Sequence, residues 1–385
     1  MVMATTVELA PERTDSRLTD LRLQVRSFLE AERAAGTFTP RCDSWMAAPD
    51  PAFTRKLAQL GWVGMTIPKA YGGHGRTPLE RFAVSEELLA AGAPVAAHWI
   101  ADRQMAPSIV RNGTEEQKRR YLPAIARGEC FISIGMSEPD SGSDLASVRT
   151  RARQVEGGWE LTGTKVWTTG AHFAHALVLL ARTDPGEGIR HAGLSQFLVD
   201  LPHSRITVRP ILTIDGQHHF NEVVFDEAVV PASSLLGERG RGWQQVTAEL
   251  AHERSGPERL MSTVPLGEAW VTRARNNGAD PVVRREIGRV TAAAWSLRQM
   301  SAAVASALAE GRSPDVEAAL VKDLGSQFEQ EVVQAVRRSS SLEAAIDPEF
   351  ARLLMDGVLH SPVFTLRGGT NEILRSVVAR GLGAR

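Results

Sequence analysis

The sequence has few cysteines and no long apolar segment. Only Cys42 and Cys130 occur among the 385 residues, too few for a disulfide framework or a four-thiolate metal site. No apolar run approaches the roughly 20 residues that a transmembrane helix needs, and residues 1–13 contain Glu8 and Glu12 but no apolar signal region. Basic and acidic side chains nearly balance, 44 against 45, so charge predicts no nucleic-acid or membrane partner. We expect a reduced, cytoplasmic protein.

Two common catalytic patterns are also absent. The sequence has no Gly-x-Ser-x-Gly segment, which argues against an esterase that uses Ser141 or Ser143 as its nucleophile. Residues 237–242, Gly-Glu-Arg-Gly-Arg-Gly, have neither the Gly-x-Gly-x-x-Gly spacing of a dinucleotide loop nor the lysine of a P-loop. We therefore interpret residues 237–242 as the turn that begins a helix.

Histidines occur in two close pairs, His172 with His175 and His218 with His219. Neither pair has acidic or thiol side chains at the spacing of a metal-binding motif. We therefore expect these to be ordinary loop histidines and predict no metal site.

The character of the sequence changes twice along the chain. Residues 1–127 have apolar residues at helical spacing, residues 128–240 have short apolar runs between turns, and residues 241–385 are helical again, with alanine-rich segments at 292–308 and 316–336. Short strands are expected at Trp159–Trp167, Ala176–Leu180, Ser195–Asp200, Ile206–Leu212 and Phe220–Phe225. The pattern predicts an N-terminal helical domain, a middle β-domain of barrel or sandwich type, and a C-terminal helix bundle.

Two segments of the middle region carry the most information. Residues 134–144, Ile-Gly-Met-Ser-Glu-Pro-Asp-Ser-Gly-Ser-Asp, combine a strand end with a loop whose N–H groups and hydroxyls suit an electron-rich ring edge or a phosphate. Residues 163–170, Gly-Thr-Lys-Val-Trp-Thr-Thr-Gly, form a strand that places an indole beside hydroxyl groups. Alone, either segment is typical of a surface turn or a core tryptophan. Together and in this order they favour a ring-binding site.

Both segments resemble signatures of the acyl-CoA dehydrogenase flavoprotein family. Residues 137–144 fit the form Thr/Ser-Glu-Pro-x-x-Gly-Ser-Asp, and residues 162–169 are similar to Asn/Gly-Gly-x-Lys-x-Trp-Ile/Thr-Thr/Ser, with Thr162 as the one mismatch. Further matches in order and spacing extend the resemblance over nearly the whole chain: residues 61–64, 68–73, 121–123 and, in part, 368–373. The resemblance implies an acyl-CoA dehydrogenase-like fold whose helical, β and four-helix-bundle domains occupy 1–127, 128–240 and 241–385.

The resemblance also implies an FAD cofactor held by the middle domain. Ser137 and Thr169 would hydrogen-bond the flavin ring, the backbone around Met136 would lie along it, and Trp167 would cover one face. Remaining contacts are implied for Gly142 and Ser143 with the flavin edge, its phosphates or the pantetheine arm of the substrate, for Thr370 with the cofactor, and for Arg254 with the substrate thioester arm.

The family reaction needs a carboxylate that removes the α proton of the thioester while the β hydrogen leaves as hydride. In many members this carboxylate precedes the Gly-Thr of the C-terminal motif, where this chain has Gly368. A smaller group, which includes isovaleryl- and long-chain acyl-CoA dehydrogenases, carries the base as the first residue of a Glu-Arg pair. This chain resembles that group, with Glu253-Arg254 as the pair.

The helix that carries Glu253 supports its assignment as the base. An apolar stripe runs along it at spacings of three and four: Trp243, Val246 and Leu250. Glu253 falls three residues further on, at the border of the stripe, where partial burial raises a carboxyl pKa and favours a base. The alternative is an exposed Glu253 in an ordinary surface pair with Arg254. Glu249 and Glu258 are expected to lie farther round the helix, in solvent.

Two stretches depart from the family pattern. Members usually have Arg-x-x-Phe-Gly and Gln-x-x-Gly-Gly segments that hold the FAD adenylate across a subunit interface. The corresponding residues here, 273–278 and 335–340, read Arg-Ala-Arg-Asn-Asn-Gly and Ala-Val-Arg-Arg-Ser-Ser. The adenylate is therefore held differently, or a non-identical subunit supplies the contacts. Arg337 and Arg338 either pair with phosphate or form a solvated basic pair.

Three functions remain open from the sequence. The first is an acyl-CoA dehydrogenase that passes electrons to an electron-transfer flavoprotein, as a homo- or hetero-oligomer, either a dimer or a tetramer. The second keeps the fold but acts on a carrier-protein thioester, or lets the reduced flavin react with oxygen. The third is a structural subunit of a heteromeric complex. Trp167 and Glu253 favour the dehydrogenase, and the sequence does not specify the acyl chain.

Overall fold

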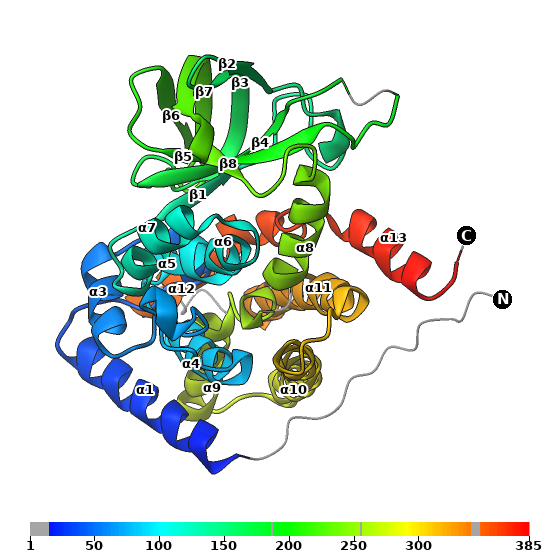
Figure 1. The fold of residues 1–385 in the computed structure, drawn as a ribbon. Coiled ribbons are helices and arrows are strands. Elements are labelled where there is room, and N and C mark those ends of the chain that lie inside the picture. The colour runs from blue at the N-terminus through cyan, green and yellow to red at the C-terminus, as the bar shows by residue number, and fades with distance from the viewer. Residues whose placement is uncertain (1–14, 186–187, 255, 340–346, 385) are drawn as a thin grey trace. The chain divides into compact units, whose positions relative to one another are not determined.

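The computed structural model describes residues 15–185, 188–254, 256–339 and 347–384, with only the backbone of residues 250–253. The chain divides into two units, each assembled from separate segments (Figure 1). Met1–Pro49, Thr77–Val95 and Glu253–Arg385 form the first, here called the helical unit, and Asp50–Arg76 and Ala96–His252 form the second, the sheet unit. The predicted order of helical, β and helical regions is confirmed, whereas the domain boundaries near 128 and 241 stay predictions.

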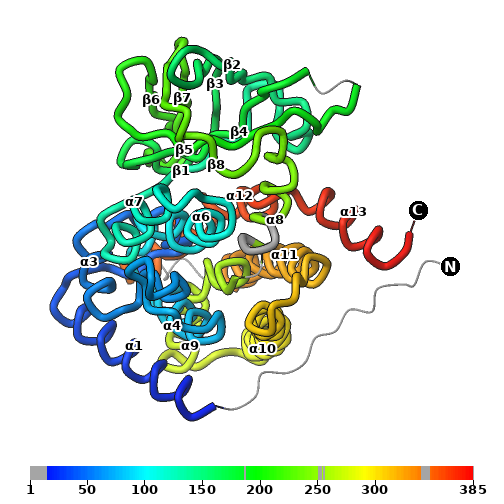
Figure 2. The backbone as a smooth tube through the Cα atoms, in the orientation of Figure 1, coloured from blue at the N-terminus to red at the C-terminus, as the bar shows by residue number. Residues whose placement is uncertain are grey.

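The helical unit is built around α11, which contacts α9, α10, α12 and α13. Its α-helices are α1 Ser16–Ala34, α2 Ser44–Ala47, α4 Pro78–Ala90, α9 Val264–Asn277, α10 Pro281–Ala309, α11 Asp315–Ser339, α12 Pro348–Phe364 and α13 Asn371–Gly381. Helices α10 and α11 lie side by side (Figure 2). Among the described residues, no helix has the length and apolar character that crossing a membrane requires.

Helix α10 begins well before its alanine-rich stretch. The Asp280 carboxylate accepts hydrogen bonds from the N–H groups of Val282 and Val283, and Pro281 occupies the first turn, where its missing N–H costs nothing. The fully buried positions start only at Leu297. The alanine-rich segment at 292–308 is therefore the C-terminal part of α10, and its predicted helical character is confirmed.

The sheet unit combines short helices with one sheet. The helices are α3 Pro51–Gln59, α5 Ala96–Ile100, the π-helical segment Ala101–Met105, α6 Ala106–Asn112, α7 Glu115–Ala126 and α8 Gly242–Arg254. Thr114 and Gln117 form a capping box at the start of α7. Apolar side chains of α6 and α7 pack in one core cluster with side chains of β1 (Ile132–Gly135) and β4 (Ala176–Arg182). The helices therefore cover one region of the sheet.

The sheet has eight strands in the order β6-β7-β3-β2-β4-β5-β8, with β1 paired to β4. Besides β1 and β4, they are β2 Arg151–Val155, β3 Gly158–Thr169, β5 Leu194–Asp200, β6 Ile206–Leu212, β7 His218–Pro231 and β8 Leu235–Leu236. All five predicted strands are present. Strand β2 was missed, because Arg-Ala-Arg-Gln-Val carries one fully buried residue and gives little apolar signal.

Candidate functional site

The two signature segments of the sheet unit are joined by a buried ion pair. Lys165 of β3 lies 2.8 Å from a Glu138 carboxylate oxygen, and both side chains are buried. Glu138 also accepts hydrogen bonds from the backbone N–H groups of Arg149 and Thr150, at 2.7 and 2.8 Å. Burial opposes the charge of Glu138, but Lys165 and these donors outweigh it and hold its pKa below the usual value. Burial lowers the pKa of Lys165 to about 8, against the effect of Glu138.

Backbone contacts complete the connection between the two segments. The ammonium of Lys165 donates to the Met136 carbonyl at 2.8 Å, and the N–H of Val166 donates to the Ser137 carbonyl at 2.9 Å. The Ser133 hydroxyl of β1 donates to the Thr169 carbonyl at 2.7 Å. The loop after β1 and the end of β3 are thus held together along their length. Sequence reasoning missed this role of Glu138 and Lys165, although both belong to the signatures.

Beside this connection an indole faces outward. Trp167 is 57% exposed and has a φ of +59°, in the left-handed region where a bulky residue is strained by about 1–3 kcal/mol. The half-buried Ser137 and Thr169 lie on the two joined segments, and neither hydroxyl has a hydrogen-bond partner among the described residues. We call Met136, Ser137, Trp167 and Thr169 the platform. Gly142 and Ser143 are exposed on the adjoining loop.

The platform fits a flat heteroaromatic ring with acceptor atoms on its edge. An exposed indole offers a face for stacking, and the hydroxyls of Ser137 and Thr169 are donors whose protein partners are missing from the described chain. A Cβ at Gly142 would meet nothing within 4 Å, so the loop leaves room for a close approach by a ligand. These residues therefore match the chemistry of an isoalloxazine ring.

Helix α8 packs in an apolar cluster that also contacts Met136 of the platform. Its Val246 is buried in a cluster with Val148, Leu180 and Leu194, and Trp243 and Met136 pack against that cluster. The predicted stripe is confirmed at its first two positions. The side chains of Leu250 and Glu253 lie outside the described residues, so the assignment of Glu253 as the base stays a prediction.

Two other glutamates of this region are buried, which contradicts the expectation that they are solvated. Glu249 is 6% exposed and accepts hydrogen bonds from the Ser108 hydroxyl of α6 at 2.5 Å and the Gln196 amide of β5 at 3.0 Å. Glu258 is 2% exposed. The partners of Glu249 lie 141 and 53 residues away in sequence, so helical spacing alone could not reveal them.

In the helical unit, two buried cations hold the glycine loop that precedes α13. The Arg254 guanidinium, 9% exposed, donates to the Gly368 carbonyl at 3.1 Å, and Lys322 donates to the Gly369 carbonyl at 2.8 Å. Both glycines have positive φ, which suits this tight turn. Thr370 is the N-cap of α13 and accepts the N–H of Ile373 at 3.5 Å. Arg254 thus has a structural contact, and substrate contacts of Arg254 and cofactor contacts of Thr370 stay predictions.

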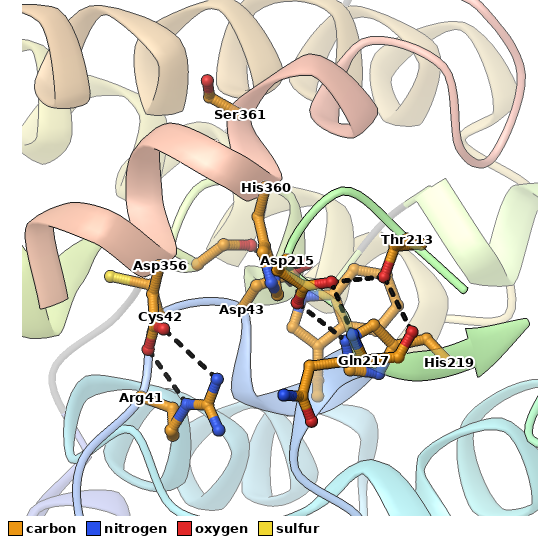
Figure 3. A network of polar contacts seen from close by, with 12 residues as sticks. Arg41, Cys42, Asp43, Thr213, Asp215, Gln217, His219, Asp356, His360 and Ser361 are labelled. Carbon is orange, nitrogen blue, oxygen red and sulfur yellow. Dashed lines mark hydrogen bonds and ion pairs between the residues drawn. The ribbon is translucent and has the colours of Figure 1, made fainter. Parts of the chain in front are cut away.

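The paired histidines take part in hydrogen bonds with other residues of the sheet unit. Asp215 of the β6–β7 connection accepts from the Thr213 hydroxyl and from the Gln217 N–H, and pairs with His219 at 3.2 Å (Figure 3). His175 accepts from the Phe131 N–H at 3.1 Å. His172 and His175 lie in a connection, as expected, whereas His218 and His219 are the first two residues of β7, so the expectation of loop histidines was wrong for that pair.

The stretches that depart from the family pattern lie at helix ends. Residues 273–277 end α9, where the Arg273 guanidinium lies 5.4 Å from the centre of the Phe350 ring. Arg337 and Arg338 are exposed in the last turn of α11, where positive charge complements the helix dipole. Their predicted contact with a phosphate stays a prediction, and Ser340 lies outside the described residues.

Three domains of one protein family match most of the chain. Residues 16–129, 133–228 and 240–383 match the N-terminal, middle and C-terminal domains of acyl-CoA dehydrogenase. Acyl-CoA dehydrogenase FadE29 of Mycobacterium tuberculosis is 33% identical over 347 residues, 85% of this chain and 86% of that protein. Acyl-CoA dehydrogenase IpdE1 of the same organism is 33% identical over 386 residues, 94% and 96% of the two chains.

Two solved structures have the same fold. The Tcur3481-Tcur3483 steroid ACAD matches with a TM-score of 0.86 and 29% identity, over 97% of this chain and 99% of that one. The ChsE4-ChsE5 complex from Mycobacterium tuberculosis matches with a TM-score of 0.82 and 26% identity, over 96% and 98%. The chain belongs to the acyl-CoA dehydrogenase family, flavoprotein oxidoreductases that act on the CH–CH group of acyl-CoA substrates.

Proposed function

We propose that this chain catalyses the FAD-dependent α,β-dehydrogenation of an acyl-CoA thioester and delivers the electrons to an electron-transfer flavoprotein. Bound FAD would supply the hydride acceptor, flavin N5. The platform carries the proposal, because an exposed indole in a strained backbone conformation, beside two hydroxyls available for a ligand, is arranged for a planar partner. Trp167 would cover one flavin face, and Ser137 and Thr169 would donate to the ring.

Glu253 is proposed as the base that removes the α proton. Its helix, α8, packs through Val246 and Trp243 on the cluster that includes Met136 of the platform. At the other position where family members carry the catalytic carboxylate, this chain has Gly368, which has no side chain. Arg254, which follows Glu253, donates to the Gly368 carbonyl. This contact would hold the end of α8 in place and so limit the positions that the Glu253 carboxylate can take.

The remaining predicted contacts belong to the substrate arm and the phosphates. Gly142 and Ser143 lie exposed on the loop beside the platform, and they are proposed to contact the flavin edge, its phosphates or the pantetheine arm. Thr370 begins α13, and the N-terminus of a helix favours a negatively charged phosphate. Arg254 is proposed to act beside the thioester through its charge. A cytoplasmic location stays a prediction.

The test is anaerobic reduction of the bound flavin. The purified holoprotein is titrated with a panel of acyl-CoA thioesters, alongside Glu253→Gln and the control Glu156→Gln, an exposed residue of the β2–β3 turn. The wild type and the control are expected to bleach near ~450 nm, the visible band of oxidised flavin, and Glu253→Gln is expected to bleach almost not at all. Full activity of Glu253→Gln would remove it from the mechanism.

A second candidate function is that of one subunit in a heteromeric dehydrogenase. It is favoured by the loss of both adenylate-binding patterns, at 273–278 and 335–340, and the two structures above are each named for two proteins. A purified chain that is colourless alone and gains FAD only with a second subunit would support it. Rapid reoxidation of the reduced flavin by air would instead support an oxidase.

A further inference from the structure

Trp167 lies in a β-bulge. Between the pairs Lys165↔Val223 and Thr168↔Asn221, β3 has two residues where β7 has one, so the register shifts by one residue. A bulge re-aims side chains and disrupts the ladder locally. Trp167 has its φ of +59° within this bulge. A bulky residue keeps that conformation only where its surroundings impose it, so the structure should contain a group that does.

The side chain of Asn221 is placed to impose it. Asn221 lies opposite Thr168 on β7, is fully buried, and donates from its amide nitrogen to the Thr168 carbonyl at 2.9 Å. That carbonyl belongs to the residue directly after Trp167, at the point where regular pairing resumes. A side-chain donor thus fixes the backbone on the far side of the bulge.

Two histidines contact the Asn221 carboxamide. Its oxygen lies 2.7 Å from His218 Nε2, which donates, and its nitrogen lies 3.3 Å from His172 Nδ1, which accepts. The two imidazole rings stack with centroids 3.9 Å apart and planes 23° apart. The Thr168 carbonyl can only accept, so only this orientation of the amide donates to it, and each histidine takes the tautomer that the orientation requires. The carboxamide is therefore restricted to the orientation that donates to the bulge.

The indole itself is braced by the residue before Asn221. Phe220 pairs with Thr169 and meets Trp167 edge to face, with ring centroids 5.8 Å apart and planes at 81°. Consecutive residues of β7 thus hold the backbone and the ring. The connection that leads into β7 is itself fixed by the contacts of Asp215 shown in Figure 3.

From these contacts we infer that Asn221 is a positioning residue, which acts through the Thr168 carbonyl to hold the Trp167 indole against the flavin. The effect on the flavin rests on the proposed function, whereas the effect of Asn221 on the indole does not. The order of the indole is a property of the protein without cofactor, and the effect on FAD is a separate consequence. Each of these two effects is measured by its own experiment.

The first experiment uses ¹⁹F NMR of the protein labelled with 5-fluorotryptophan. The chain has eight tryptophans, and Trp167→Gly assigns the signal of residue 167. Asn221→Ala and Asn221→Asp are both expected to shift and broaden this signal and to leave the other seven nearly unchanged, because neither side chain can donate to Thr168. Asn276→Ala, an exposed control in α9, should change nothing.

His218→Gln keeps Asn221 but loses the ring that packs and hydrogen-bonds against its carboxamide, so a smaller shift of the same signal is expected. This variant also serves if the Asn221 variants fail to fold. A Trp167 signal that is unchanged in the folded Asn221 variants, or in His218→Gln where those do not fold, would overturn the inference.

The second experiment is a double-mutant cycle on FAD affinity, measured with the wild type, Asn221→Ala, Trp167→Gly and the double variant. Asn221→Ala alone is expected to weaken FAD binding about tenfold, and to have less than about a twofold effect when residue 167 is glycine, because its action passes through the indole. Equal losses in both backgrounds would show that Asn221 acts elsewhere. A chain that binds no FAD even with a partner subunit refutes the proposed function, while the NMR result still decides the role of Asn221.

Discussion

Each unit of the molecule contains a buried ion pair next to a segment with a predicted role in the reaction. In the sheet unit, Glu138 and Lys165 follow Ser137 and precede Trp167. In the helical unit, the Arg367 guanidinium donates to both Asp43 carboxylate oxygens at 2.6 and 2.7 Å and directly precedes the glycine loop. The charged groups are buried, and the neighbouring residues with a predicted ligand contact, Ser137, Thr169 and Thr370, are uncharged. The two ion pairs therefore hold the backbone of segments whose ligand contacts are predictions.

The two pairs differ in how many partners support the cation. Lys165 has one carboxylate, Glu138, and one carbonyl, that of Met136. Arg367 pairs with Asp43 and lies 3.8 Å from an oxygen of a second carboxyl group, that of Glu329. It also donates to the Ser262 hydroxyl at 2.9 Å. Its guanidinium also lies 4.3 and 4.8 Å from the ring centres of Trp45 and Phe364. Removal of the one cation that pairs with Glu138 should therefore cost more than removal of one of the several partners of Arg367.

The largest effect is expected from Lys165→Met. It leaves the Glu138 carboxylate buried without a cation, which costs about 3–5 kcal/mol of unfolding free energy, measured by urea denaturation. The double variant with Glu138→Gln should recover part of the loss, because no unpaired charge remains. A loss below about 1 kcal/mol, the value of an exposed pair, would show that the pair does not organise the platform.

The next effect concerns pH in the helical unit. Burial raises the pKa of Glu329 to about 7, although Arg367 opposes the shift. The folded state therefore holds this proton more tightly than the unfolded state, so its contribution is complete below the usual pKa of 4.5 and is lost as the pH rises through 7.

Glu329→Gln should remove that loss. The wild type is expected to lose about 3 kcal/mol relative to Glu329→Gln between pH 4.5 and 8, from a shift worth about 1.4 kcal/mol per unit. Urea denaturation of both proteins across this range measures the difference. A constant difference would mean that Glu329 is ionised throughout.

Asp43→Asn should have a smaller effect than Lys165→Met. Asparagine tolerates the left-handed φ of +55° at this position and still accepts one hydrogen bond, while Glu329 and Ser262 remain beside Arg367. We expect a loss of about 2 kcal/mol, the upper range for a hydrogen bond to a charged group. The exposed Asp226→Asn serves as the control. A loss as large as that of Lys165→Met would contradict the comparison.

The two ion pairs also differ in how far the sequence could predict them. Glu138 and Lys165 stand 27 residues apart within two recognisable segments, so the platform residues could be named from the sequence. Asp43 and Arg367 stand 324 residues apart, and no local pattern connects them. The burial of Glu249 depends in the same way on Ser108 and Gln196, from other elements. The positions of helices and strands along the chain follow local periodicity, whereas buried polar partners depend on tertiary packing.

The smallest expected effects come from replacing two exposed tryptophans by glycine. The two replacements should change the free energy of unfolding in opposite directions. Trp167, at φ +59°, is strained, whereas Trp295 lies within α10 and is 65% exposed. Glycine adopts the left-handed conformation freely, so Trp167→Gly should stabilise the cofactor-free protein by about 1 kcal/mol, the low end of such strain. Trp295→Gly should destabilise it by about 1 kcal/mol, because glycine weakens a helix interior. Urea denaturation measures both. Destabilisation by Trp167→Gly of the same size as by Trp295→Gly would mean that the contact with Phe220 outweighs the strain, and that the indole conformation is favourable even before a ligand binds.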